Sequence, residues 1–183
     1  MALYFATSNK HKFAEAKEIL PGISHFNFSH NEIRSDSLEE IALEAVGAAY
    51  LQIKKPVFVE DTGLFVEALN GFPGAFSAWV LGKIGCEGIL RLMQSEKSRA
   101  ASFKTCIAFT DGKIAKTFSG ECKGSIANKQ HGKNGFGYDP IFVPEGYEKT
   151  FAEAPEIKKK VSHRYNALMQ LKDYLGSSIR PYL

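Results

Sequence analysis

Cysteine is scarce in this sequence. Only three of the 183 residues are cysteines, Cys86, Cys106 and Cys122, and no two of them form a CxxC pair. An odd number at wide spacing argues against a disulfide framework, and the lack of paired thiols argues against a structural zinc site. We therefore expect three reduced thiols in a cytoplasmic protein.

Long apolar runs and strong net charge are also lacking. No stretch reaches the roughly 20 apolar residues of a membrane span. The apolar run near the N-terminus is short and is followed by lysines, unlike a secretory signal. The formal net charge of +3 suits an anionic ligand but is too small to indicate a nucleic acid or a membrane surface. We expect neither a membrane association nor a stable nucleic-acid complex.

The sequence does contain enough apolar side chains to build a substantial core. Hydrophobic residues make up 44% of the chain and aromatic residues 12%. We find no internal repeat, low-complexity tract or linker-like segment. These features predict one globular domain over residues 1–183, with two lobes and no separable second domain.

The hydrophobic patterns alternate between strand and helix. Ser37 and Glu40 form a capping box, and Asp111-Gly112 suits a hairpin turn. The predicted elements are a strand, polar turn and helix within residues 2–22, a helix over 37–53, a short strand over 55–61 continued by 66–69 beyond a Thr-Gly turn, helical segments up to Gln94, a hairpin over 101–122 and a last helix capped by Ser162. This order predicts an α/β fold with a mixed central sheet flanked by helices.

The first polar turn has the composition of a phosphate site. Thr7, Ser8 and Asn9 stand between the first strand and the first helix, and Lys10 and Lys12 follow closely. Unpaired N–H groups and partial positive charge at a helix N-terminus favour bound phosphate. The turn lacks the glycines of a Walker loop. The alternative is that Ser8 or Asn9 only caps the helix and the lysines are solvated.

Two adjacent carboxylates, Glu60 and Asp61, end the strand over 55–61, and Glu32 stands in the loop before the second helix. Two neighbouring acids repel each other, and a cation bound between them would relieve that repulsion. Mg²⁺ needs only one or two protein carboxylates beside phosphates and water. The three acids therefore predict an Mg²⁺ site, with Mn²⁺ as an alternative ion. Exposed acids at a strand end are the other interpretation.

A glycine-dense loop ends in aromatic residues that suit a nucleobase. In NGFGYDPIF, Phe136 and Tyr138 offer rings for stacking, and Asp139 can accept a hydrogen bond from a ring N–H. The alternative is that Phe136 and Phe142 belong to the core and Asp139 begins a turn.

Hydrogen-bond donors gather in KKKVSHR, where Lys158, Ser162, His163 and Arg164 lie close together. They suit the edge of a base, although an ordinary solvated charge run has the same composition. Together with the turn, the acids and the aromatics they form the set that a nucleoside triphosphate site requires.

The order of these strings resembles a known family. TSNKHK, VEDTGLFVEALNGFPGAFSAW, FGYDPIF, EGYEKTFAEAP and SHRYNAL follow one another as in the inosine/xanthosine triphosphate pyrophosphatase (Ham1-like) family, from Leu3 to about Leu175. The resemblance implies two lobes around a nucleotide-binding cleft, Mg²⁺-dependent hydrolysis of ITP, dITP and XTP to the monophosphate and pyrophosphate, and a homodimer.

The resemblance also implies roles for individual residues. Thr7, Asn9 and Lys12 match the family's triphosphate-binding turn, with Ser8 between them. Glu32 and Asp61 match its metal ligands, Asp61 also its general base, and Glu60 stands beside them. The residues that match its base-recognition set are Phe136, Tyr138, Asp139, Lys158, Ser162, His163 and Arg164. The spacing leaves the choice among Lys158, Lys159 and Lys160 open, and we prefer Lys158, four residues before Ser162.

Two other functions remain compatible with the residues. A Maf-like nucleotide pyrophosphatase acting on dTTP or modified pyrimidines would share the architecture, although FGYDPIF and SHR argue against it. An RNA-binding module would use the basic C-terminal residues and the aromatics, but its net charge would be low for that role.

Overall fold

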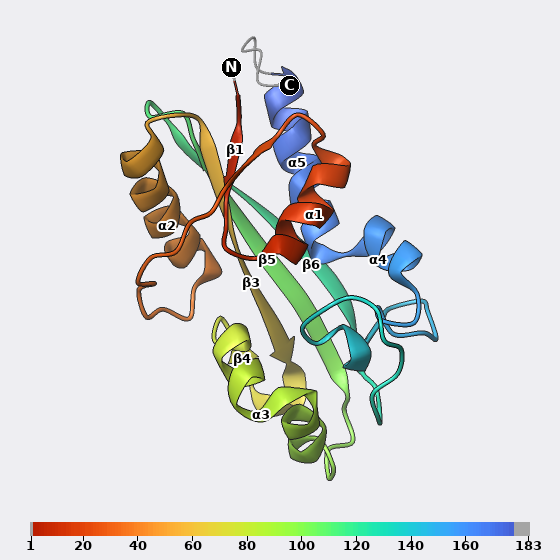
Figure 1. The fold of residues 1–183 in the computed structure, drawn as a ribbon. Helices are drawn as coiled ribbons and strands as arrows, with labels where there is room; N and C mark the ends of the chain where they lie inside the picture. The colour runs from red at the N-terminus through yellow and green to blue at the C-terminus, as the bar shows by residue number, and fades with distance from the viewer. Residues whose placement is uncertain (1, 178–183) are drawn as a thin grey trace. The chain divides into compact units, whose positions relative to one another are not determined.

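The computed structural model describes residues 2–177 and has the predicted α/β architecture (Figure 1). Its seven strands form one sheet, in which the order is β2-β1-β3-β5-β6-β7 and β4 pairs with β3. β1 pairs in parallel with both β2 and β3. β4 pairs antiparallel with β3, and β7 pairs antiparallel with β6. The sheet is therefore mixed, as the sequence predicts.

The N-terminal half of the sheet is built from two parallel crossovers. The elements, in chain order, are β1 (Tyr4–Ala6), α1 (Lys10–Ile19), β2 (Ser24–Phe26), α2 (Leu38–Ile53) and β3 (Val57–Val66). Because β2 and β3 lie on either side of β1, right-handed crossovers place α1 and α2 on opposite faces of the sheet. Figure 1 shows α1 on one side of β1 and α2 on the other.

Strand β3 is longer than the sequence pattern predicts. It runs without a turn through Thr62 and Gly63 to Val66, and a 3₁₀ turn, η1 (Glu67–Leu69), replaces the predicted continuation. A side chain at Gly63 would collide with the carbonyl oxygen of Gly74 in β4 (Pro73–Gly74). The glycine that resembled a turn residue is instead required by this close strand pairing.

The remaining predicted elements are present. α3 (Ser77–Leu92) contains a non-helical residue, Gly85, and the hairpin consists of β5 (Ala100–Thr110) and β6 (Ala115–Ile126). The Oδ1 atom of Asp111 accepts hydrogen bonds from the N–H groups of Lys113 and Ile114, which fixes the hairpin turn.

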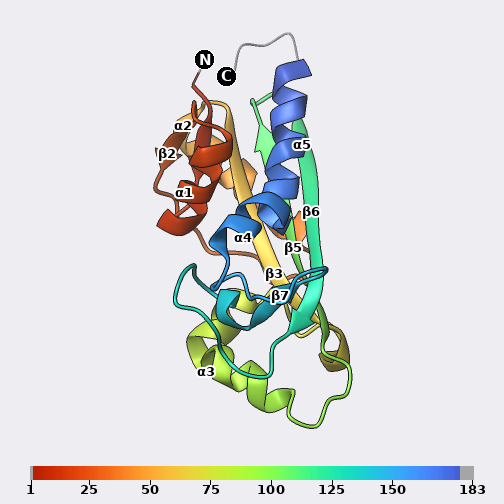
Figure 2. The same cartoon turned by 90° about the vertical axis from the view of Figure 1, so that its right-hand side faces the viewer.

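The C-terminal third contains elements that the sequence pattern did not separate. They are η2 (Asp139–Ile141), β7 (Phe142–Pro144), α4 (Pro155–Val161) and α5 (His163–Ser177). Figure 2 shows α4 close to β7 and to the loop that precedes β7. Ser162 lies between α4 and α5, directly before the predicted last helix.

The chain divides into two compact units, each with its own apolar core. Unit 1 comprises the described parts of Met1–Asp61, Thr105–Gly120 and Arg164–Leu183, and unit 2 comprises Thr62–Lys104 and Glu121–His163. Phe5, Phe58 and Leu171 belong to the core of unit 1, and Leu64, Phe142 and Phe151 to that of unit 2. In residues 2–177, no helix has both the length and the apolarity needed to cross a membrane.

All three cysteines are free thiols and are buried. Burial is the main cause that raises the pKa of each thiol, at Cys86, Cys106 and Cys122, to about 11. They are therefore protonated at neutral pH, and we expect slow reaction with a thiol reagent such as Ellman's reagent in the folded protein and rapid reaction in denaturant. Rapid labelling of the folded protein would contradict this burial.

Candidate functional site

The predicted phosphate turn is a well-ordered helix cap. Asn9 caps α1, and its Oδ1 atom accepts hydrogen bonds from the N–H groups of His11 (3.0 Å) and Lys12 (3.1 Å). The Thr7 hydroxyl accepts the Asn9 N–H at 3.1 Å, and Ser8 is exposed. The capping alternative is thus correct for Asn9. A capped N-terminus still carries the partial positive charge that attracts phosphate, so the cap is compatible with the phosphate site, which stays a prediction.

Glu60 lies at the centre of a buried ionic network in unit 1. Its side chain is 0% exposed and accepts two hydrogen bonds from the Arg164 guanidinium, at 2.8 Å from Nε and 2.6 Å from Nη2. Arg164 Nη1 also pairs with Glu15 at 2.6 Å. The Lys12 ammonium and the Thr105 hydroxyl each lie 3.4 Å from Glu60 Oε1. The network joins α1, β3, β5 and α5.

The two carboxylates anchor Arg164 as a permanent cation. Burial by itself lowers the pKa of the Arg164 guanidinium, but Glu60 and then Glu15 raise it above its ordinary value. The sequence predicted Arg164 beside the base. The structure places its guanidinium on carboxylates of α1 and β3, and its contact with the base stays a prediction.

Asp61 lies on the other face of the sheet from Glu60. Successive side chains of a strand alternate between faces. Thr105 and Cys106, which are adjacent in β5, therefore also face opposite sides. Thr105 contacts Glu60. Burial raises the pKa of the Cys106 thiol, and the carboxylates of Glu39 and Asp61 add to that rise. Because Thr105 contacts Glu60, the alternation places Asp61 and Cys106 on the opposite face.

The three predicted metal ligands differ in their surroundings. Both oxygens of Glu60 are engaged by Arg164, Glu32 is exposed in the loop before α2, and the Oδ2 atom of Asp61 is buried. Within residues 2–177, no three or more His, Cys, Asp or Glu side chains gather as a ready-made metal cluster. The donor chemistry fits a hard cation held by one or two carboxylates together with substrate phosphates.

In unit 2, Asp139 and Lys158 form a buried ion pair. The Lys158 ammonium donates to Asp139 Oδ2 at 2.7 Å, and their side chains are 6% and 3% exposed. The same oxygen accepts the Phe136 N–H at 2.8 Å, and the ammonium lies 4.3 Å from the centre of the Phe136 ring. A Cβ atom at Gly135, where φ is +76°, would collide with the Asp139 carboxylate. The loop is therefore built around this pair.

The structure distinguishes the three lysines among which the spacing could not choose. Lys158 is buried against Asp139 and Phe136, whereas Lys159 and Lys160 are exposed. All three belong to α4. Only Lys158 of the three therefore lies with the aromatic loop.

Three further predicted base-binding residues, Tyr138, Ser162 and His163, are also buried in unit 2. The Tyr138 hydroxyl donates to the Ser77 carbonyl oxygen at 3.0 Å, and burial raises the pKa of this phenol. Ser162 donates its N–H to the Lys158 carbonyl oxygen, and the His163 ring stacks on Phe103, with the ring centres 4.6 Å apart. Tyr138 belongs to the core, so half-buried Phe136 is the better stacking surface.

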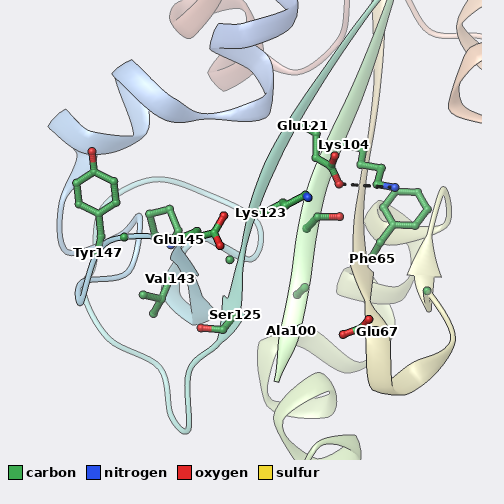
Figure 3. Close-up of a pocket in the computed structure, with 16 residues that line it drawn as sticks. Phe65, Glu67, Ala100, Lys104, Glu121, Lys123, Ser125, Val143, Glu145 and Tyr147 are labelled. Carbon is green, nitrogen blue, oxygen red and sulfur yellow. Dashed lines mark ion pairs between the residues drawn. The ribbon is translucent and has the colours of Figure 1, made fainter. Parts of the chain in front are cut away.

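The predicted residues do not line the pocket drawn in Figure 3, which lies within unit 2. This pocket has a volume of about 680 Å³ and is bounded by residues of β3, β5, β6 and β7. Lys104 pairs with Glu121 at 3.7 Å inside it, and the Lys104 ammonium also lies over the Phe65 ring. Lys104 is thus already paired there, and no residue of the predicted phosphate turn lines the pocket.

Sequence reasoning missed four residues that support the candidate sets. Glu15 and Thr105 hold the Glu60 network, and Phe103 and Ser77 contact His163 and Tyr138. Glu15 alone left a local signal, because it stands three residues after Lys12 and so shares its helix face. The other three become neighbours only through strand and helix packing.

The sequence profile of the Ham1 family matches residues 3–174, which include every residue of both sets. The chain belongs to the Ham1 family. It is 46% identical to the dITP/XTP pyrophosphatase of Saccharolobus solfataricus, with 93% of this chain and 92% of that protein aligned. The corresponding protein of Methanopyrus kandleri is also 46% identical, over 98% of both chains.

Solved structures of Ham1 proteins have the same fold. The Staphylococcus aureus Ham1 protein superimposes with a TM-score of 0.84 and 33% identity, covering 96% of this chain and 98% of that one. A HAM1 protein from Coxiella burnetii also gives 0.84, with 32% identity and coverage of 97% and 100%. The Ham1 resemblance read from the five sequence strings is confirmed.

Proposed function

We propose that this protein hydrolyses the deaminated purine nucleotides ITP, dITP and XTP to the monophosphate and pyrophosphate, and so removes them from the nucleotide pool. The observation that carries this proposal is its near full-length similarity to proteins named dITP/XTP pyrophosphatase. The two residue sets described above supply the chemistry that this reaction requires.

The phosphates are bound by residues of unit 1. Thr7, Ser8 and Asn9 present hydroxyl and amide groups at the N-terminus of α1, and Lys12 adds an ammonium one turn later. The helix dipole favours negative charge at the same end. These groups neutralise the charge that develops on the departing pyrophosphate, which is the main form of catalysis in phosphoryl chemistry.

The base is bound by residues of unit 2. Phe136 offers a ring face, while Asp139 and Lys158 hold each other in fixed positions beside it. Ser162 and His163 provide further polar groups near the start of α5. Donors in this set suit the 6-oxo group of hypoxanthine or xanthine, whereas the 6-amino group of adenine would oppose donor to donor. Such a mismatch costs factors on the order of 10⁴ in well-built pockets.

Asp61 is the general base. Its carboxylate takes a proton from the water that attacks the α-phosphorus, and the bond between that phosphorus and the bridging oxygen of pyrophosphate breaks. Glu32 and Asp61 would hold Mg²⁺, or alternatively Mn²⁺. When bound, the ion supplies charge neutralisation at the phosphate oxygens.

Metal removal gives a direct prediction. We expect EDTA to abolish ITP hydrolysis and added Mg²⁺ to restore it, because Lys12 alone leaves most of the triphosphate charge uncompensated and the carboxylates of Glu32 and Asp61 add further negative charge. Initial rates measured across a Mg²⁺ titration, with Mn²⁺ in parallel, check this. Full activity in excess EDTA would contradict the proposed requirement.

The substrate class is tested by product chromatography after separate incubations with ITP, XTP, dITP, GTP, ATP and dTTP. We expect IMP, XMP and dIMP, each with pyrophosphate, and almost no cleavage of ATP. Cleavage of dTTP with survival of ITP would favour the Maf-like alternative. A salt-dependent RNA complex without any hydrolysis would favour the RNA-binding alternative.

We also propose that the enzyme is a cytoplasmic homodimer. Three buried free thiols suit a reducing compartment. Light scattering during size-exclusion chromatography is expected to give the mass of two chains, and the mass of one chain would contradict the dimer.

A further inference from the structure

The contacts of Glu60 assign it a role different from that of its neighbour Asp61. Its fully buried carboxylate is held by a two-pronged hydrogen bond from Arg164 and by the Thr105 hydroxyl. Lys12 approaches the same residue at two points, 3.4 Å from Oε1 and 3.4 Å from the backbone carbonyl oxygen. The ammonium is therefore directed by both the side chain and the main chain of Glu60.

The network pairs two cations with two carboxylates and is tied to the phosphate turn. Arg164 and Lys12 contribute two positive charges, and Glu60 and Glu15 contribute two negative charges. Lys12 and Glu15 are both on α1, three residues apart, so the helix that begins at the phosphate turn is fixed to β3 and α5 at two points. The Lys12 side chain remains 19% exposed, whereas that of Glu60 is 0% exposed. An arriving phosphate can thus reach Lys12 but not Glu60.

We propose that Glu60 is a positioning residue that holds the Lys12 ammonium toward the substrate phosphates. This inference rests on the proposed function, and it reassigns a carboxylate that the sequence placed among the metal ligands. A metal ion at Glu60 would compete with Arg164 for the oxygens of this carboxylate and would weaken a buried ion pair. Asp61 faces the other side of the strand from this network.

The test compares Glu60→Gln with wild type. Glutamine keeps the shape but removes the charge that directs Lys12, so we expect the KM for ITP to rise roughly 10- to 100-fold, the range for one charged hydrogen bond. The Mg²⁺ concentration for half-maximal activity should not change. Glu18→Gln, at an exposed position of α1, controls for the loss of one negative charge from the protein.

Tripolyphosphate has no base, so its binding without metal, measured by calorimetry, reports the affinity of the phosphate-binding residues alone. The measurement does not depend on base recognition or on catalysis. We expect weaker binding by Glu60→Gln and no additional loss when Glu60→Gln is added to Lys12→Ala, because the effect passes through Lys12. If Glu60→Gln does not fold by circular dichroism, Glu60→Asp keeps a buried negative charge and shortens the side chain that reaches Lys12. The same binding loss is expected for that variant.

Two results would overturn the proposal. An increased Mg²⁺ requirement with unchanged tripolyphosphate affinity would make Glu60 a metal ligand. An equal loss of affinity in the wild-type and Lys12→Ala backgrounds would make its role purely structural. If the wild-type protein binds tripolyphosphate but leaves ITP intact, the proposed function fails, while the binding comparison still decides the role of Glu60.

Discussion

Replacing Asp61 by asparagine is expected to lower kcat for ITP by roughly 10²- to 10⁴-fold, the usual contribution of a general base. Asparagine has nearly the same size but cannot take the proton of the attacking water. Asp61 lies on the face of β3 opposite Glu60, so the Glu60 network with Lys12 should stay intact. The KM for ITP should therefore change much less than kcat.

Initial rates at saturating Mg²⁺ measure this effect, and tripolyphosphate binding confirms that the phosphate side is preserved. Asp173→Asn, at an exposed position of α5, is the matched control and should behave as wild type. If Asp61→Asn retained near wild-type turnover, Asp61 would not be the base. Together with Glu60→Gln, this variant separates the roles of two adjacent carboxylates.

Replacing Lys158 by methionine is expected to reduce the free energy of unfolding by about 3–5 kcal/mol, the typical effect of removing one partner of a buried ion pair. The Asp139 carboxylate would keep the Phe136 N–H but lose its paired cation. The preference for ITP over ATP should fall as well, because the loop that presents Phe136 is organised around this pair.

Urea unfolding followed by circular dichroism measures the stability change, and kcat/KM for ITP and ATP measures the selectivity. Lys160→Met removes an exposed lysine of the same helix and should cost no more than about 0.5 kcal/mol. Adding Asp139→Asn to Lys158→Met should recover part of the stability, because no uncompensated charge would then be buried. Equal stability of the Lys158→Met and Lys160→Met variants would contradict the importance of the pair.

Local features of the fold and of the phosphate turn could be predicted from sequence. Asn9 and Ser37 cap α1 and α2 through side-chain hydrogen bonds to residues two or three positions away. Asp111 similarly orders the hairpin turn. Such interactions depend on neighbouring residues alone, so their sequence signals survive without knowledge of the fold.

Contacts between distant segments could not be predicted in the same way. Arg164 and Glu60 are 104 positions apart, and their pairing depends on how α5 packs against β3. Gly63 resembled a turn residue because it follows Thr62 and because the residue it packs against, Gly74, could not be recognised from sequence. Gly74 lies on a strand of only two residues, which is too short to leave a pattern. One conclusion was nevertheless available: if β3 continues through Glu60 and Asp61, the two side chains must face opposite sides.

Hydrolysis of ITP in water enriched in ¹⁸O tests the central claim most directly. Attack on the α-phosphorus predicts that mass spectrometry finds the heavy oxygen in IMP, with unlabelled pyrophosphate as the other product. Label in pyrophosphate would place the attack on the β-phosphorus. Release of IDP and inorganic phosphate, or recovery of intact ITP, would contradict the assignment as a pyrophosphatase of deaminated purine nucleotides.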